Sequence, residues 1–206
     1  MAYIANTAFQ PKVSNGAYNG LQNVAGKFFN DSDLPDVCSA GFIVEQVELL
    51  PNEGYESFDI LNGNTWKMGV AADGNVEGFN GDHTGLYACN TYNVHRVVSA
   101  NGEMIYNLGA NTLGLAAAAD EIADFTELLV GHQYKFGIGN FASEPATGQY
   151  CEIANGLFAT SSATLPTDNG VVYGEVLRAE PFTEGSTDAG TGYVVRILRT
   201  AVSDFT

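Results

Sequence analysis

Asn-Gly dipeptides are the feature of this sequence that most restricts its fold. The pair occurs seven times, and Asp73-Gly74 adds an eighth pair of the same kind. Both residues of such a pair readily adopt positive φ, which the type I′ turn of a two-residue β-hairpin requires. Several pairs separate apolar runs, so the sequence predicts antiparallel strands joined by tight turns. The Asn-Gly pairs begin at residues 15, 19, 62, 80, 101, 155 and 169.

Nine segments have the composition of β-strands. The chain contains 24 Gly, and charged residues make up only 16% of it, so strong helix formers are scarce. We therefore predict a mainly β protein: an antiparallel β-sandwich or barrel with many hairpins and at most one or two short helices. The predicted strands are 41–49, 64–70, 86–98, 103–108, 125–130, 133–138, 150–158, 170–179 and 192–200.

One segment favours a helix as much as a strand. Residues 116–124 are rich in alanine and acidic residues, and Ile122, Phe125 and Leu129 follow a near-helical spacing. A short helix over 116–124 is therefore as well supported as its absence, whereas 125–130 is predicted as a strand.

The first part of the chain differs from the rest. Residues 1–24 are rich in Asn, Gly and Ala and show no clear period. They predict an extended N-terminal arm that orders against another surface, with an irregular first strand packed on the body as the alternative. Residues 25–206 are predicted to form a β-rich body, either one domain or two closely packed β units, because no linker separates two halves.

The charge of the chain excludes several partners. Lys and Arg total 8 and Asp and Glu total 24, which gives a formal net charge of −16. Nucleic acid and anionic membranes both require clustered basic residues, so neither is expected as a partner. No apolar run approaches the length of a membrane span, and the first residues contain no basic or apolar run typical of a secretory signal.

The three cysteines predict no disulfide framework and no zinc site. Cys38, Cys89 and Cys151 are odd in number, and their spacings of 51 and 62 residues do not resemble the short pairs of zinc ligands. We expect three buried thiols that pack as small apolar residues in a protein made in a reducing cytosol.

One acidic loop has part of a cation-binding pattern. Asp73, Asn75 and Glu77 alternate, and Asp82 could add a further oxygen. The bidentate Glu of a calcium loop is missing, because Thr84 occupies its position. A solvated acidic hairpin loop is the favoured interpretation, and no metal or other cofactor is expected.

The sequence contains no recognised catalytic motif. It lacks a nucleophile elbow, a P-loop and a His-Glu-x-x-His pair, and we expect no enzymatic activity. Trp66, the only tryptophan, could serve as a sugar-binding platform in a carbohydrate-binding module. A core or interface anchor is the commoner role of a single tryptophan in a β domain.

Several stretches resemble virion structural proteins of tailed bacteriophages. They combine the Met-Ala-Tyr-Ile-Ala-Asn start, frequent Asn-Gly hairpins and free cysteines. Two segments, 17–21 (Ala-Tyr-Asn-Gly-Leu) and 134–141 (Tyr-Lys-Phe-Gly-Ile-Gly-Asn-Phe), look similar to head-associated proteins of phages that infect Gram-positive bacteria. Within that group the chain most resembles capsid decoration, or cement, proteins.

The resemblance implies a function. Decoration proteins are β-rich, often trimeric, and bind the major capsid protein on the outside of the mature shell, which they stabilise by binding only the expanded state. It thus implies a homotrimer, synthesised in the host bacterial cytoplasm and located on the capsid exterior. A head fibre, a tail or baseplate component, and an adhesin-type carbohydrate-binding module are the alternatives. The apolar residues of the predicted arm are the expected shell contacts: Tyr3, Ile4, Phe9 and Tyr18.

Overall fold

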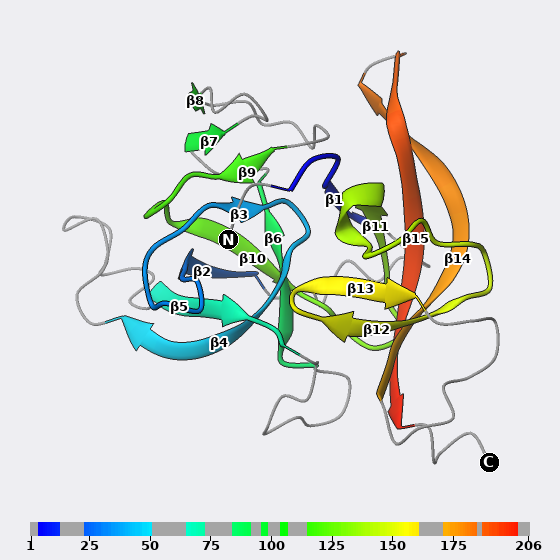
Figure 1. Ribbon diagram of the computed structural model, residues 1–206, viewed down its shortest axis with the longest axis horizontal. Coiled ribbons are helices and arrows are strands. Elements are labelled where there is room, and N and C mark those ends of the chain that lie inside the picture. Colours follow the sequence, from blue (N-terminus) through cyan, green and yellow to red (C-terminus); the bar gives the residue numbers. More distant parts are fainter. Residues whose placement is uncertain are drawn as a thin grey trace.

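Strands form nearly all of the regular structure that the computed structural model describes (Figure 1). The described residues are 4–12, 23–50, 65–72, 84–91, 96–98, 104–106, 115–160, 171–184 and 187–201. Several antiparallel sheets pack in a sandwich-like arrangement, which confirms the prediction of a mainly β protein. The predicted acidic loop, with Asp73, Asn75, Glu77 and Asp82, lies outside the described residues. Two of the four predicted shell contacts, Tyr3 and Tyr18, also lie outside them.

Five strands close into a barrel in the order β10-β2-β5-β4-β6. Neighbours pair antiparallel except β2 and β5, which run parallel with Gly26 opposite Trp66. The strands are β2 (Asn23–Phe28), β4 (Ile43–Leu50), β5 (Thr65–Val70), β6 (Leu86–Asn90) and β10 (Ala123–Glu127).

Two open sheets accompany the barrel. The six-stranded sheet has the order β1-β11-β15-β14-β12-β13, and the four-stranded sheet has the order β3-β9-β7-β8. The first consists of β1 (Phe9–Lys12), β11 (Gln133–Gly137), β12 (Tyr150–Ala154), β13 (Leu157–Thr160), β14 (Val171–Glu184) and β15 (Thr187–Ala201). The second consists of β3 (Cys38–Ser39), β7 (Arg96–Val98), β8 (Met104–Tyr106) and β9 (Ala116–Ala117), and a 3₁₀ helix, η1 (Ile138–Asn140), follows β11.

Strand β6 of the barrel wall is buried on both faces. Leu86 and Ala88 of β6 point to an inter-sheet core between the barrel and the six-stranded sheet, whereas Tyr87 and Cys89 point to a barrel core. This explains why the sequence of β6 is an unbroken apolar run, since successive side chains of a strand point to opposite faces.

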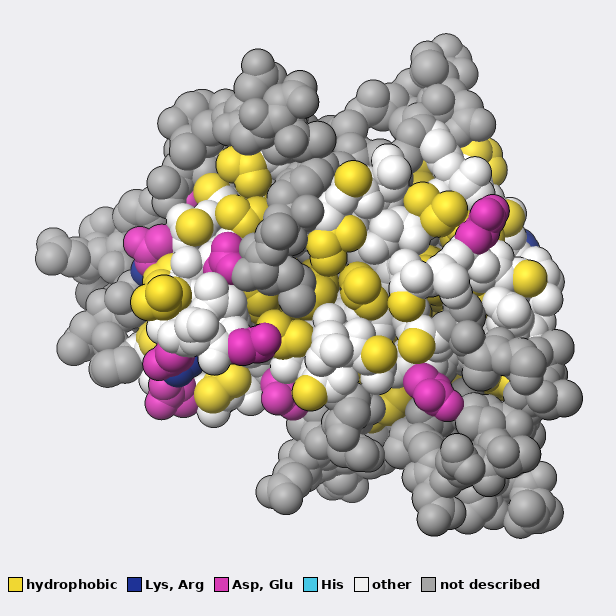
Figure 2. Space-filling model, in the orientation of Figure 1, with side chains coloured by type: hydrophobic (Ala, Val, Ile, Leu, Met, Phe, Trp, Pro, Cys, Tyr) yellow, Lys and Arg dark blue, Asp and Glu magenta, His cyan; other side chains and the backbone are white. Residues whose placement is uncertain are grey.

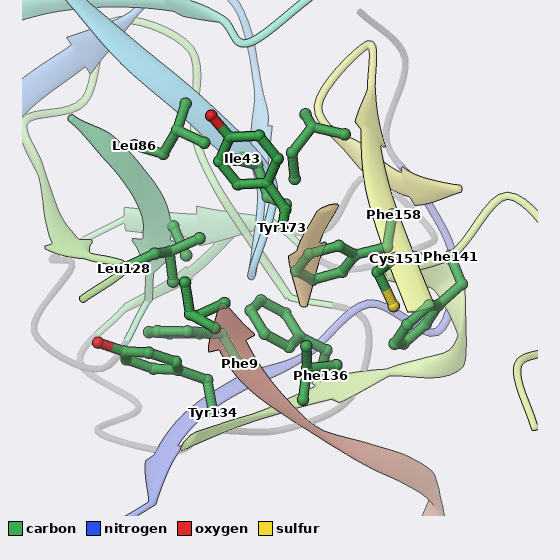
Figure 3. Close-up of a cluster of buried hydrophobic side chains, with 14 of the residues drawn as sticks. Phe9, Ile43, Leu86, Leu128, Tyr134, Phe136, Phe141, Cys151, Phe158 and Tyr173 are labelled. Carbon is green, nitrogen blue, oxygen red and sulfur yellow. The ribbon is translucent and has the colours of Figure 1, made fainter. Parts of the chain in front are cut away.

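Aromatic side chains dominate the inter-sheet core (Figure 3). The ring centroids of Phe9 and Phe136 are 5.3 Å apart, and those of Phe136 and Phe158 are 4.9 Å apart in an edge-to-face contact. Such pairs add roughly 0.5–1.5 kcal/mol each beyond the apolar area that they bury. The same core receives Ile43, Leu86 and Leu128 from the barrel side, so it joins the two larger sheets.

Asn140 holds the N-terminal segment against the body. Its side chain is buried, accepts hydrogen bonds from Ala8 N at 3.0 Å and Gly137 N at 3.1 Å, and donates to Ala40 O at 2.9 Å. Glycine is required next to it, because a Cβ at Gly139 would lie 2.1 Å from Ala5 O. Without a side chain at Gly139, the backbone of the N-terminal segment packs directly against the backbone of the 137–140 turn.

The predicted arm is corrected for residues 4–12. β1 pairs with β11, with Phe9 opposite Phe136, so this segment is the edge strand of the six-stranded sheet. Residues 4–12 therefore fit the alternative prediction, a first strand packed on the body. Phe9 is buried in the inter-sheet core and is unavailable as a shell contact, because any partner would have to unfold β1 to reach it. Ile4 is partly buried against the barrel core, with its N–H donated to Ser39 Oγ.

Two local predictions are also corrected. The helix over 116–124 is wrong: Ala116 and Ala117 form β9 between β3 and β7, and Asp120 adopts a φ of 61° that ends any right-handed helix. The predicted strand 150–158 is a hairpin of β12 and β13. Its turn is the Asn155-Gly156 pair, with φ values of 49° and 78°, as the type I′ geometry requires.

We expect the substitution Asn140→Ala to lower the free energy of unfolding by about 3 kcal/mol, because it removes the side chain that bonds the buried Ala8 N and Ala40 O, whereas Gly137 N keeps its bond to Ala8 O. Urea denaturation measures the change. Gln10→Ala is the control, since Gln10 lies half-buried on the same N-terminal segment, and it should cost less than about 0.5 kcal/mol. Equal effects of the two substitutions would contradict the role given to Asn140.

We expect Tyr134→Phe to destabilise the protein and to change its alkaline behaviour. The buried Tyr134 hydroxyl accepts from Leu129 N at 3.0 Å and donates to Glu127 O at 2.9 Å, so its loss should cost about 1–3 kcal/mol at neutral pH. Tyr193→Phe, which removes a partly exposed bond to Glu144, should cost less.

Burial raises the pKa of Tyr134 to about 12, from 10.0. The folded state therefore holds the phenol proton more tightly than the unfolded state does. The resulting stability is fully present below about pH 10 and is lost as the pH rises towards about 12. Urea denaturation across this range should show a smaller decline in Tyr134→Phe than in wild type. An identical decline in both would exclude Tyr134 as a contributor.

Candidate interaction surface

The structure separates the residues that the sequence singled out. Trp66 lies on β5, is partly buried and packs against the barrel core, which is the anchor position rather than that of an exposed sugar platform. Cys38, Cys89 and Cys151 are all buried free thiols, as predicted. Phe9 and Ile4 belong to the packed N-terminal segment, so none of these residues forms a common exposed site.

A different set of side chains stands out on the surface. Among the described residues, the exposed large hydrophobic side chains are Leu34, Val47 and Leu49, with exposed fractions of 60%, 53% and 45%. All belong to the barrel end of the molecule, two on β4 and one in the loop after β2. We call these three residues the barrel patch. In Figure 2, hydrophobic and acidic side chains alternate over this end of the molecule, at the left of the view.

The loop that presents Leu34 is held by Asn30. Asn30 Oδ1 accepts hydrogen bonds from Ser32 N at 3.0 Å and Leu34 N at 3.2 Å, while Asn30 N donates to Leu34 O. Asn30 Nδ2 also donates to Asp36 Oδ2 at 3.1 Å. The exposed leucine is thus presented on a preorganised turn, so little conformational entropy is lost when a partner covers it.

A β-bulge presents Val47. The pairing of β4 with β5 shifts register between Gln46 and Glu48, which leaves Val47 as the extra residue. Its side chain lies over Gly69, where a Cβ would come within 2.8 Å of Val47 Cγ2. Beyond the bulge, β4 extends away from the six-stranded sheet, as Figure 1 shows. Val47 and Leu49 therefore lie on the part of β4 that the six-stranded sheet does not cover.

Lys67 connects the loop to the bulged strand. Its Nζ lies 2.5 Å from Asp33 Oδ1 and 3.1 Å from Glu48 Oε1, and 5.4 Å from the centroid of the Phe29 ring. The hydrogen bonds to Asp33 and Glu48 raise the pKa of Lys67 above its ordinary value. Asp33 precedes Leu34 and Glu48 follows Val47, and both carboxylates bind the same Lys67 ammonium. The loop with Leu34 and the strand with Val47 therefore lie on one surface.

The sequence contained only a weak signal for this surface. The run Ile43–Leu50 reads as a strand, and nothing in it shows that its second half has no sheet above it. The Asn30 turn could have been found from the short polar run 30–33, because Asn readily caps its own following backbone. The contact of Lys67 with Asp33 and Glu48 depends on the pairing of β4 with β5, which the sequence did not predict.

Within the described ranges, no three His, Cys, Asp or Glu side chains come together in a way that could hold a metal ion. The described part of the chain also has no helix whose length and apolar character would let it cross a membrane. Comparison with known proteins finds no family model, no curated protein and no solved structure that matches the chain.

We expect Asn30→Ala to loosen the loop of the barrel patch without unfolding the barrel. The substitution removes the acceptor for Ser32 N and Leu34 N, and it should cost about 1 kcal/mol. Hydrogen exchange of the Ser32 and Leu34 amides should become faster. Asp31→Ala, at an exposed neighbouring position, is the control. Unchanged exchange at both amides in Asn30→Ala would show that Asn30 does not hold the loop.

Proposed function

We propose that this chain is a non-enzymatic structural protein of a tailed bacteriophage, which binds the major capsid protein on the outside of the head and stabilises the mature shell. The observation that carries the structural part of the proposal is the barrel patch. Three large aliphatic side chains are exposed on a preorganised turn and a bulged strand, where they gain nothing for the folding of the chain itself. The phage assignment rests on the sequence resemblance.

The charge of the chain favours a partner other than a second copy at this patch. The net charge of −16 makes copies repel one another at long range. Acidic side chains, Asp33 and Glu48, stand directly beside the exposed apolar ones. A capsid surface that offers apolar area with basic neighbours would match this arrangement, since complementary charges fix the orientation of a contact.

The small size of the patch supports a multivalent arrangement. The three side chains are only about half exposed, so burying what remains stabilises a contact by roughly 2–5 kcal/mol before the cost of association is subtracted. One patch alone would therefore bind weakly. A homotrimer that engages three equivalent sites on a head would bind far more tightly without any new kind of contact. The number three and the threefold or quasi-threefold positions come from the resemblance to decoration proteins, and the weak single patch supports only multivalent binding.

The test mixes the full chain with undecorated mature heads from its own source and counts the copies that sediment with them. Wild type should saturate at many copies per head, in a multiple of three. The double variant Val47→Asp, Leu49→Asp should bind at least tenfold more weakly, since losing about 1.4 kcal/mol or more gives that factor. The double variant Ala179→Asp, Thr191→Asp, at exposed positions of β14 and β15, adds the same two charges as a control and should bind like wild type.

Each other outcome has a definite meaning. Saturation at a few copies per head would indicate a head fibre or vertex component instead. Binding only to tails would indicate a tail or baseplate component, and no binding to any virion part would overturn the proposal. Wild-type binding by the variant Val47→Asp, Leu49→Asp would leave the capsid role intact but exclude the barrel patch as the contact.

A further inference from the structure

Two of the three cysteines form a contacting pair, although they are 51 residues apart in the sequence. Cys89 Sγ donates a hydrogen bond to Cys38 O at 3.6 Å, so the Cys89 thiol lies directly against residue Cys38. Both side chains are buried in the barrel core, with exposed fractions of 1% and 0%. The backbone holds them there, because Gly41 N donates to Cys89 O at 2.8 Å and Cys89 N donates to Phe42 O at 3.0 Å.

The strand that carries Cys38 is the weakest part of this arrangement. β3 contains only two residues, lies at the edge of the four-stranded sheet and pairs only with β9 in that sheet. Short edge elements with few partners open locally at a lower free energy than the body of a fold. β6, which carries Cys89, is paired on both sides by β4 and β10. Cys38 is therefore the thiol of the pair that solvent reaches first.

We infer that Cys38 and Cys89 are a redox-active dithiol that closes to a disulfide when the protein meets a small oxidant such as a peroxide, joining the four-stranded sheet to the barrel. The inference does not depend on the proposed function. It assigns a modification site to residues that otherwise serve only as packing in the core.

The chemistry balances with hydrogen peroxide as the oxidant. The Cys38 thiolate attacks one peroxide oxygen, the O–O bond breaks, and Cys38 becomes a sulfenic acid while the released oxygen leaves as water. When β3 closes again, the Cys89 sulfur attacks the Cys38 sulfur. The S–S bond forms, the S–O bond breaks, and the oxygen leaves as a second water with the Cys89 proton. Two thiols lose two electrons, and one peroxide is reduced to two waters.

The reaction should be slow at neutral pH and faster in base. Burial raises the pKa of the Cys38 thiol well above its ordinary value, with the contact to Cys89 acting in the same direction. The thiolate is the reactive form, so Cys38 reacts mainly when β3 opens to water, and the small opened fraction keeps the reaction slow. Below the pKa of the opened thiol, the rate should increase about tenfold for each unit of pH.

Cys151 provides an internal control. It is buried in the inter-sheet core among aromatic side chains (Figure 3), and neither other cysteine is part of that core. Burial raises the pKa of the Cys151 thiol to about 12. The native fold therefore predicts one specific linkage, between Cys38 and Cys89, out of the three that three cysteines allow.

Peptide mapping of the full-length native protein tests the inference. After peroxide treatment, free thiols are blocked with iodoacetamide, and the protein is unfolded, blocked again and cleaved with trypsin. Trypsin cleaves after Lys27, Lys67 and Arg96, so Cys38 falls in the peptide 28–67 and Cys89 in the peptide 68–96. We expect these two peptides to be joined, with the loss of two hydrogen atoms, and to separate on addition of dithiothreitol.

Variants keep the test specific. Cys151→Ser should form the same linkage at the same rate, whereas Cys38→Ser and Cys89→Ser should form none. Closing a loop of this length should raise the midpoint of thermal unfolding by about 10 °C in the oxidised protein. Recovery of 28–67 and 68–96 as separate alkylated peptides from oxidised wild type would overturn the inference, as would a linkage to Cys151 in place of Cys38–Cys89. Because the mapping uses wild type, these outcomes hold even if a serine variant fails to fold.

Discussion

The double burial of β6 is the constraint on which the rest of the structure depends. Leu86 and Ala88 face one core while Tyr87 and Cys89 face the other, so a single strand forms the boundary of both. Removing either layer would expose an unbroken apolar strand to water, which costs about 25 cal/mol for every Å² of apolar area. The barrel and the six-stranded sheet therefore share one hydrophobic core.

The buried polar side chains of Asn140 and Tyr134 are hydrogen-bonded to the backbone. Asn140 satisfies backbone groups of three separate segments, and the Tyr134 hydroxyl spans Leu129 and Glu127. A buried polar group without a partner is costly, so these side chains specify where the N-terminal segment and the turn after β10 must lie. The aromatic packing around Phe9 then follows from that placement.

The surface that carries the proposed function arises where this body ends. β4 extends beyond Ile43, its residue in the inter-sheet core, and its later part presents Val47 and Leu49 to solvent between acidic and polar side chains. The bulge at Val47 and the Asn30 turn keep these side chains in fixed positions instead of letting them fold inward. Cys38 and Cys89 also pack as core residues, and the contact of Cys89 Sγ with Cys38 O is the basis for inferring that they form a reactive pair.

The sequence by itself determined the β class, the burial of the thiols and the turn at Asn155-Gly156. Alternation, apolar runs and Asn-Gly pairs are local signals, and the Asn155-Gly156 hairpin follows directly from the φ values that those residues allow. Only the tertiary structure decided that residues 116–117 are a strand, that Phe9 lies in the core, and that Leu34 and Val47 share a surface. Each of these depends on pairing between segments far apart in the chain. Their energies come from neighbours that local propensity does not report, which is why alanines with high helix propensity lie in β9 between β3 and β7.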